Sequence, residues 1–389
     1  MSAIAGIWSF DGGIPAVPSC REMLQALSVY GGDDCAQYDS DSLSMGRCLL
    51  RLLPEDCFDR QPLSADGVTA LVADVRLDNR EEIAAGVGLS RQQTAVMADS
   101  EVLLAAWLRW REECVDHLSG AFSFAVWNQK EQHLFLARDH TGERPLFYAS
   151  SANNFAFSSM PKGLHRLPFV GAEVNEDYIA RYLTLANIPI EQTVFRHMLR
   201  LPAGCSLSVR RDETKLSRYW RTDHLADLRL GSAEEYLECF REKFDRAVRV
   251  RLRTRGGIGA QLSGGLDSAA VAATAAQLLA GDGREFTCFT AVPRPGFSGA
   301  NVGEIADITM PLAANTQLFP EMTGRLTAGP EWLRILARPQ PGISMEQAKA
   351  RLAVIWPQLA NVAVTPRMPA ARRKALLGST LDVIPGATG

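Results

Sequence analysis

The chain lacks the long apolar run that a membrane-spanning helix requires. None of its apolar stretches reaches the length of about 18 residues at which a spanning helix becomes a candidate. The amino terminus also lacks a basic segment followed by an apolar one, which is the pattern of a secretory signal. We therefore expect a soluble cytoplasmic protein that does not contact a membrane.

Paired cysteine motifs are missing as well. The eight cysteines are scattered without a C-x-x-C pair, and the six histidines are dispersed. An even number of cysteines is compatible with disulfides, but without a secretory signal reduced thiols are the better interpretation. The formal net charge is only −3, so the charge balance does not indicate nucleic acid. We predict no zinc site and no nucleic-acid partner.

Apolar residues are plentiful, by contrast. They make up 47% of a 389-residue chain, which is enough for two or three domains with their own cores. Short apolar segments bounded by turns predict a strand that starts at the amino terminus, before the turn at 11–13, and further strands at 68–75, 121–127, 133–137, 145–148 and 155–157. Residues 100–110 show helical spacing between them. The pattern predicts a layered α+β sandwich in the first half of the chain.

One segment joins an apolar run at 258–262 to a glycine turn and then to a run of good helix formers at 269–279. A strand–turn–helix of this kind directs backbone N–H groups at an anion, and glycine lets a phosphate approach. The candidate ligand residues are Leu262, Ser263, Gly264, Gly265, Asp267 and Ser268. Asp267 would repel phosphate unless a cation joined it, so we expect Mg²⁺ there. The alternative is a glycine-rich turn without a ligand.

The first half of the chain resembles the glutaminase domain of asparagine synthetases, which has the N-terminal-nucleophile hydrolase fold. The most specific match is R-D-H-T-G-E-R-P-L-F-Y at 138–148. Further matches lie at 4–7, 99–102, 118–125, 193–195, 201–204 and 219–220. The turn at 263–268 resembles the S-G-G-x-D-S pyrophosphate loop of the same family. The resemblance covers about residues 1–320 and implies ATP and Mg²⁺ as cofactors, with adenine near the backbone of Cys288 and the nucleotide flanked by Leu262.

The resemblance implies the following division of the chain. Residues 1–170 form a glutaminase-like domain (glutamine amidotransferase type 2), and 171–233 form a connecting segment. Residues 234–323 begin an α/β ATP pyrophosphatase domain of the adenine-nucleotide α-hydrolase type. This domain opens with an amphipathic helix at 234–255, where we expect Arg251, Arg253 and Arg255 to lie on a solvated face.

Several departures from the family concern glutamine hydrolysis. The family's nucleophile is an N-terminal cysteine, whereas this sequence has Ser2, which methionine removal would expose. The family's oxyanion segment aligns with 72–74, without its side-chain amide, and the arginine for the glutamine carboxylate aligns near Leu49. Asp99, which would bind the glutamine amine, is retained. We therefore expect no glutamine hydrolysis, and an amidohydrolase that depends on Ser2 is an open alternative.

An asparagine synthetase architecture without glutaminase activity is similar to β-lactam synthetases and to the macrolactam cyclases of lasso peptides. The segments 74–80 and 291–299 resemble the cyclase type. That resemblance implies a small-molecule or peptide carboxylate as substrate. An amine within the same substrate would attack the adenylate.

The tail at 324–389 departs from the family altogether. Part of it resembles the extracytoplasmic domain of macrolide-exporter-type ABC permeases. Ser344 and Gln347 predict a capping box before a helix, with Ala348, Leu352, Ile355 and Leu359 as its apolar face. The alternative is a helical end of the synthetase domain. A doubly wound sheet cut short leaves an open edge, so we expect a second copy or another partner to cover it.

These observations predict an ATP-dependent amide-forming ligase related to asparagine synthetase, which adenylates a carboxylate and releases AMP and pyrophosphate. Loss of most of the second domain would leave such an enzyme inactive. The competing hypothesis is therefore a non-enzymatic remnant that serves as a scaffold or binding module.

Overall fold

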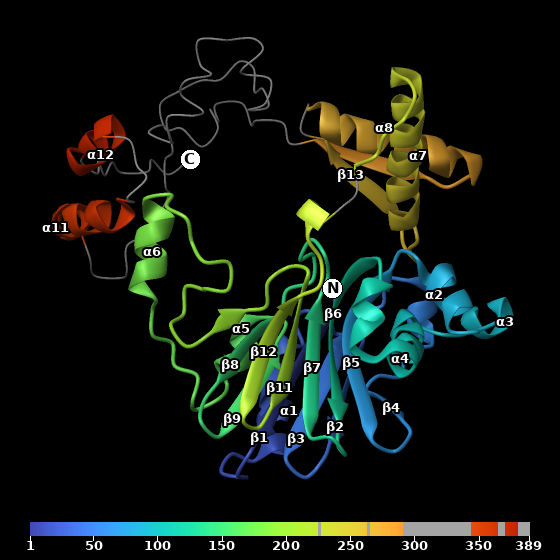
Figure 1. Cartoon of the computed structure of the whole chain (residues 1–389), viewed down its shortest axis with the longest axis horizontal. Helices are drawn as coiled ribbons and strands as arrows, with labels where there is room; N and C mark the ends of the chain where they lie inside the picture. The colour runs from blue at the N-terminus through green and yellow to red at the C-terminus, as the bar shows by residue number, and fades with distance from the viewer. Residues whose placement is uncertain (225–226, 263–264, 291–343, 365–369, 380–389) are drawn as a thin grey trace. The chain divides into compact units, whose positions relative to one another are not determined.

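The computed structural model describes residues 1–224, 227–262, 265–290, 344–364 and 370–379 (Figure 1). The chain divides into two compact units. The first contains Met1–Asn175 and Pro189–Gly256, and the second contains Glu176–Ile188 and Gly257–Gly389. The predicted segment at 291–299 lies outside the described residues.

Two six-stranded antiparallel sheets form the first unit. The strands of the first sheet, in spatial order, are β10 (Leu199–Arg200), β8 (Phe147–Ser150), β9 (Asn154–Ser158), β1 (Ala3–Ser9), β3 (Leu43–Leu49) and β2 (Asp34–Asp39). Those of the second are β12 (Glu213–Arg218), β11 (Cys205–Arg210), β7 (His133–Arg138), β6 (Gly120–Asn128), β5 (Thr69–Leu77) and β4 (Leu63–Ala65). Figure 1 shows the strands of the two sheets running side by side through this unit.

The inner faces of the two sheets enclose the largest core. The rings of Trp8 on β1 and Trp127 on β6 meet there edge to face, with centroids 4.7 Å apart. Successive side chains of a strand point to opposite faces, so Phe124 and Val126 of β6 belong to a different core on the outer side. Both faces of β6 are therefore buried, and this explains why its sequence is apolar at nearly every position.

Helices cover the outer faces of both sheets. Helix α1 (Ala16–Leu27) packs on β1 and β3, and helix α4 (Asp99–Trp110) packs on β5. The shorter helices of the unit are η1 (Pro54–Cys57), α2 (Arg80–Gly86), α3 (Arg91–Thr94), η2 (Arg111–Asp116), α5 (Pro161–Leu164) and η3 (Thr222–His224). The order helix, sheet, sheet, helix confirms the predicted α+β sandwich.

Helix α7 (Ala233–Arg251) ends four residues earlier than predicted and does not bury the apolar face that its spacing suggested. Ser232 caps its first turn by accepting the N–H of Glu235. Tyr236, Leu237 and Phe240 are exposed, with Phe240 64% accessible, whereas Val248 is buried. Within the described part of the chain, most of this apolar face is therefore exposed to solvent.

The second unit contains a parallel pair of strands joined by a helix. Strand β13 (Ile258–Leu262) pairs with β14 (Phe286–Thr290), and helix α8 (Leu266–Gly281) connects them and packs on both. This βαβ arrangement confirms the predicted strand–turn–helix layout around residues 262–268. None of the helices in the described ranges is both long and apolar enough to cross a membrane.

Within the described residues of this unit, the other helices are α6 (Glu176–Leu183), α11 (Met345–Ala363) and α12 (Ala370–Leu377). Ser344 and Gln347 form the predicted capping box at the start of α11. Ile355, expected on the apolar face of α11, is 44% exposed, whereas Ala360 is buried. Ile355 therefore does not belong to a buried face of α11, and the origin of this tail stays a prediction.

Candidate functional site

A small cavity of about 30 Å³ lies where the start of β1 meets the middle of β5. Ser2, Gln61, Asp74 and Arg144 are among the residues that line it. This volume accommodates one or two water molecules. The position that the resemblance gives to the nucleophile thus lies on the wall of this cavity.

Ser2 is almost fully buried at the edge of this cavity. Its hydroxyl oxygen accepts the backbone N–H of Leu50 at 3.0 Å, and Asp74 lines the same cavity. The serine hydroxyl is thereby held at the end of β3.

The backbone donor beside the cavity is already occupied. The side-chain oxygen of Gln61 accepts the N–H of Ala73, and the side-chain nitrogen of Gln61 donates to the Ala73 carbonyl oxygen at 3.1 Å. Val72, at the first position of the aligned oxyanion segment, points into the core between the sheets. The segment 72–74 therefore offers no free donor from Val72 or Ala73 to a developing oxyanion.

Asp74 is a buried carboxyl group in the wall of the cavity. It is 5% exposed, and its Oδ2 has no hydrogen-bond donor; Arg144 Nε is 3.6 Å away. Burial raises the pKa of Asp74 to about 6, although the positive charge of Arg144 lowers it in part. A carboxyl group in this state changes its charge close to neutral pH.

The resemblance would place the arginine that binds the glutamine carboxylate near position 49, but this position is a leucine. Arg47, two residues earlier, is completely buried and bridges Asp34 and Asp59, with N···O distances of 2.9 Å to each. Asp59 also accepts from the Gln61 side chain at 3.0 Å. Arg47 is therefore committed to holding the strand β2 and the Gln61 segment in place.

Asp99 begins helix α4, and each of its carboxylate oxygens already accepts two donors. The N–H of Leu77 donates at 2.8 Å, Arg80 at 2.5 Å, and Arg253 at 2.6 and 3.3 Å. The predicted glutamine-amine ligand is thus saturated by two guanidinium groups and one backbone donor. An incoming ammonium group would have to displace one of them.

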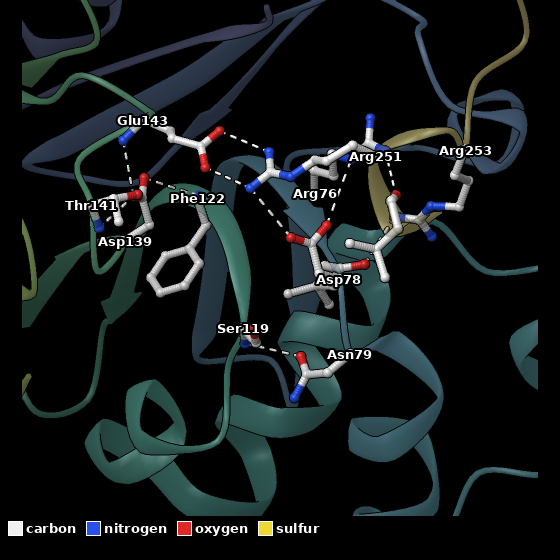
Figure 2. Close-up of polar contacts among 12 residues, drawn as sticks. Arg76, Asp78, Asn79, Ser119, Phe122, Asp139, Thr141, Glu143, Arg251 and Arg253 are labelled. Carbon is white, nitrogen blue, oxygen red and sulfur yellow. Dashed lines mark hydrogen bonds and ion pairs between the residues drawn. The ribbon is translucent and has the colours of Figure 1, made fainter. Parts of the chain in front are cut away.

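Arg253 is only 22% exposed and does not lie on a solvated face, so the prediction was wrong for this residue, whereas Arg251 and Arg255 are exposed. Figure 2 shows Arg251 between Glu143 and Asp78, donating to both Glu143 oxygens at 2.7 and 2.5 Å. Arg251 Nη2 also lies 3.3 Å from Asp78. Burial alone would lower the pKa of Arg253, but the charge of Asp99 and the hydrogen bonds to it raise that pKa overall. The helix ends where its last arginine meets the carboxylates of Glu143 and Asp78.

The motif at 138–148 builds the turn that presents Glu143 and Arg144. The buried carboxylate of Asp139 accepts the N–H group of Glu143 at 2.9 Å (Figure 2). It also accepts the N–H group of Arg144 at 2.9 Å. Gly142 has φ +73°, a conformation that a residue without Cβ adopts without strain. The motif thus places Arg144 beside Asp74 and Glu143 beside Arg251.

The nucleotide-loop candidates occupy the strand–turn–helix of the second unit. Leu262 ends β13, Gly265 caps α8, and Asp267 and Ser268 lie in the first turn of α8. Asp267 is exposed, and the Ser268 hydroxyl donates to the Gly265 carbonyl oxygen at 3.3 Å. Ser263 and Gly264 lie outside the described residues. Cys288 lies on β14 opposite Ala260, with an exposed side chain.

Asp267 is the sole carboxylate in this turn that fits the predicted metal. The described residues contain no cluster of three or more histidine, cysteine, aspartate or glutamate side chains arranged around a metal position. Mg²⁺ commonly takes one or two carboxylates and completes its shell with substrate phosphates and water. A single aspartate at the helix start fits that mode of binding.

The structure thus defines a class: a sandwich of two antiparallel sheets with buried polar residues at one end, followed by a βαβ segment with a glycine turn. A family model described as glutamine amidotransferase domain matches residues 1–220, and a model described as asparagine synthase matches residues 239–301. The first match covers more than half of the chain. The chain therefore belongs to the asparagine synthetase superfamily.

Individual relatives agree with this assignment. Asparagine synthetase [glutamine-hydrolyzing] 3 of Bacillus subtilis is 30% identical over 258 residues, which is 65% of this chain and 42% of the relative. A putative asparagine synthetase of Mycobacterium tuberculosis is 33% identical over 223 residues, 55% of this chain and 34% of the relative. The chain thus spans less than half the length of these two relatives.

The solved structures include glutamine phosphoribosylpyrophosphate amidotransferase from B. subtilis in complex with ADP and GMP. It is 15% identical, with a TM-score of 0.40, over 81% of this chain and 70% of that one. A similarity at this level carries no inference about ligands.

Sequence reasoning gave no role in the site to the residues that fill it: Gln61, Arg80, Arg47 and Arg253. Arg253 is separated from Asp99 by 154 positions, and Gln61 binds a backbone group, which no side-chain motif records. Only the fold brings these groups together.

Proposed function

We propose that this chain carries the nucleotide-activating segment of an ATP-dependent amide-forming ligase that does not hydrolyse glutamine. The observation that carries the proposal is the β13–α8–β14 unit, in which the S-G-G-x-D-S motif falls at the junction of strand and helix. That junction places helix N–H donors at an anion-binding position. Membership of the asparagine synthetase superfamily makes ATP the natural anion.

The proposed reaction begins with attack of a substrate carboxylate on the α-phosphate of ATP, with release of pyrophosphate. A nitrogen nucleophile then attacks the acyl-adenylate, and AMP leaves. The backbone N–H groups at the start of α8 would hold the departing pyrophosphate. Asp267 would help to hold Mg²⁺, which neutralises the phosphate charge when bound.

The absence of glutamine hydrolysis is proposed from the first unit. Asp99 is saturated by Arg80 and Arg253, and Ala73 N–H is held by Gln61. Ser2 would also have to replace a thiolate, which is a stronger nucleophile. The nitrogen would then come from free ammonia or from an amine within the substrate, as in β-lactam synthetases and lasso-peptide cyclases.

Calorimetric titration of Mg²⁺–ATP into the intact chain tests the nucleotide part. We expect saturable binding that weakens about tenfold or more in Asp267→Asn, since the variant loses one charged ligand of the metal. Asp282→Asn is the matched control, because Asp282 caps the other end of α8 and should leave binding unchanged. No binding by a folded chain would overturn the proposal and favour a non-enzymatic module.

A glutaminase assay tests the second part separately. We expect no glutamate release above the rate without protein, and no change in Ser2→Ala. Glutamine hydrolysis that disappears in Ser2→Ala would instead establish an amidohydrolase that depends on Ser2. A third assay identifies the substrate class: it measures ATP-dependent exchange of labelled pyrophosphate in the presence of candidate carboxylates.

A further inference from the structure

Two cysteines face each other across the edge of the first sheet. Cys35 lies on β2, which is the edge strand, and Cys48 lies directly opposite on β3. Their sulfur atoms are 3.2 Å apart. All eight cysteines of the chain are free thiols in the structure, and neither of these two belongs to the cavity or to the nucleotide turn.

The backbone at this pair suits a disulfide. Ser40 N–H donates to Leu43 O, so these two residues form a hydrogen-bonded pair at the hairpin end. Pairs alternate along an antiparallel ladder, and the Cys35–Cys48 pair lies five steps further, in the non-hydrogen-bonded class. The Cα atoms of such pairs are about 4.5 Å apart, within the 4.4–6.8 Å or so that disulfides span. Closing the bond therefore needs little movement of the strands.

The two thiols differ in exposure and in charge. Cys35 is exposed and Cys48 is buried. A hydrogen bond from the Cys48 thiol lowers the pKa of Cys35 to about 7, with a further lowering by Arg47, against the opposing effects of burial and Asp34. The same hydrogen bond and burial raise the pKa of Cys48. Cys35 is thus the accessible thiolate and Cys48 the thiol behind it.

We propose that Cys35 and Cys48 form a peroxide-sensitive dithiol that closes to a disulfide across β2 and β3. The Cys35 thiolate attacks a peroxide oxygen, the O–O bond breaks, and Cys35 becomes a sulfenic acid. The Cys48 sulfur then attacks the Cys35 sulfur, and water leaves with the thiol proton. Two thiols and one hydrogen peroxide give one disulfide and two waters, with two electrons passing from sulfur to oxygen.

The disulfide would link the edge strand β2 covalently to β3 at the Cys35–Cys48 pair. Arg47, adjacent to Cys48, already joins Asp34 of β2 to Asp59. When Cys48 does not donate to Cys35, its single thiol proton can be donated instead to Leu24 O of helix α1 at 3.3 Å, a contact that oxidation would remove. Oxidation therefore exchanges a contact with α1 for a covalent link to β2.

The test is peptide mapping of the reduced full chain after stepwise addition of hydrogen peroxide and alkylation of the remaining thiols. We expect a linked peptide that contains Cys35 and Cys48, the loss of two thiols, and recovery of both with dithiothreitol. Cys35 should react at least about tenfold faster than Cys57, which is exposed on η1 and serves as the matched control.

Two variants complete the test, and both change exposed residues so that folding is preserved. Cys35→Ser should abolish the linked peptide and leave Cys48 open to alkylation after unfolding, whereas Cys57→Ser should leave the linkage unchanged. The proposal is overturned if Cys35 oxidises no faster than Cys57. It is equally overturned if Cys35 proceeds to a sulfinic acid or pairs with another cysteine while Cys48 stays reduced.

Discussion

Replacing Arg47 by methionine keeps an unbranched side chain in place but removes a cation that is completely buried. Arg47 bonds to two carboxylates, of which Asp34 is 44% exposed and Asp59 only 6%. Asp59 would keep its contacts with Gln61 and with Ser100 at 3.2 Å, yet its buried charge would lose its cation. Removing one partner of a buried ion pair costs about 3–5 kcal/mol.

Urea unfolding followed by tryptophan fluorescence measures this cost, because Trp8 and Trp127 lie in the core between the sheets. With a slope of about 2 kcal/mol per M of urea, the midpoint of Arg47→Met should fall by about 2 M. Asp34→Asn is the control for the exposed partner. It should lower the free energy of unfolding by about 1 kcal/mol or less, since solvent screens that charge.

The double variant Arg47→Met with Asp59→Asn separates the cost of the unpaired Asp59 charge from the cost of replacing the arginine side chain. Without the carboxylate charge, no unpaired ion remains in the core, so more than half of the lost stability should return. If Arg47→Met alone lowers the free energy of unfolding by less than about 1 kcal/mol, the reasoning about the buried pair is refuted. The same holds if the double variant is no more stable than the single one.

Three further predictions concern the remaining charged and apolar groups. Burial raises the pKa of Asp74 in the folded state to about 6, compared with an ordinary value of 3.8. The folded state therefore binds more protons than the unfolded chain between these values, and stability falls as pH rises through this window. The shift of about two units corresponds to about 3 kcal/mol; Asp74→Asn should lack this loss in urea titrations at pH 4 and 7, and parallel pH profiles would contradict the assignment. Arg251→Gln removes the contacts to Glu143 and Asp78, which are partly exposed and worth about 1 kcal/mol or less. Amide exchange in the last turn of α7 should become faster in this variant but not in Arg249→Gln, whose side chain is exposed. Phe240→Ser should change the free energy of unfolding by no more than about 0.5 kcal/mol, because the ring is 64% exposed; a larger loss in thermal unfolding would show that the apolar face of α7 is covered in solution.

Part of the order of strands and helices was predictable from the sequence, because it follows from local patterns, but strands β2, β3, β4, β10, β11 and β12 and helix α1 were not predicted. Apolar runs at 121–127 and 133–137 appear as β6 and β7, and the helical spacing at 100–110 appears as α4. The strand–turn–helix at 258–279 was also predicted, because glycines and helix formers determine the backbone conformation of a few neighbouring residues. These features depend on the backbone preferences of neighbouring residues.

The end of helix α7 was the clearest exception. Sequence periodicity extended the helix to residue 255 and placed its arginines in solvent. The structure ends it at Arg251, where Arg76 donates to Val250 O at 2.6 Å and Arg251 reaches Glu143. A charge pattern along a helix cannot show which carboxylates lie opposite it.

Some properties of the site therefore followed from the sequence, and others only from the tertiary structure. The sequence by itself determined the family, the strand–turn–helix and the candidate residues Ser2, Asp99 and Asp267. Only the tertiary structure decided that Asp99 is saturated by Arg253 and that Ala73 N–H is held by Gln61. The physical reason is that hydrogen bonds and ion pairs act over about 3–4 Å in space, whereas the residues that form them lie 12 to 154 positions apart.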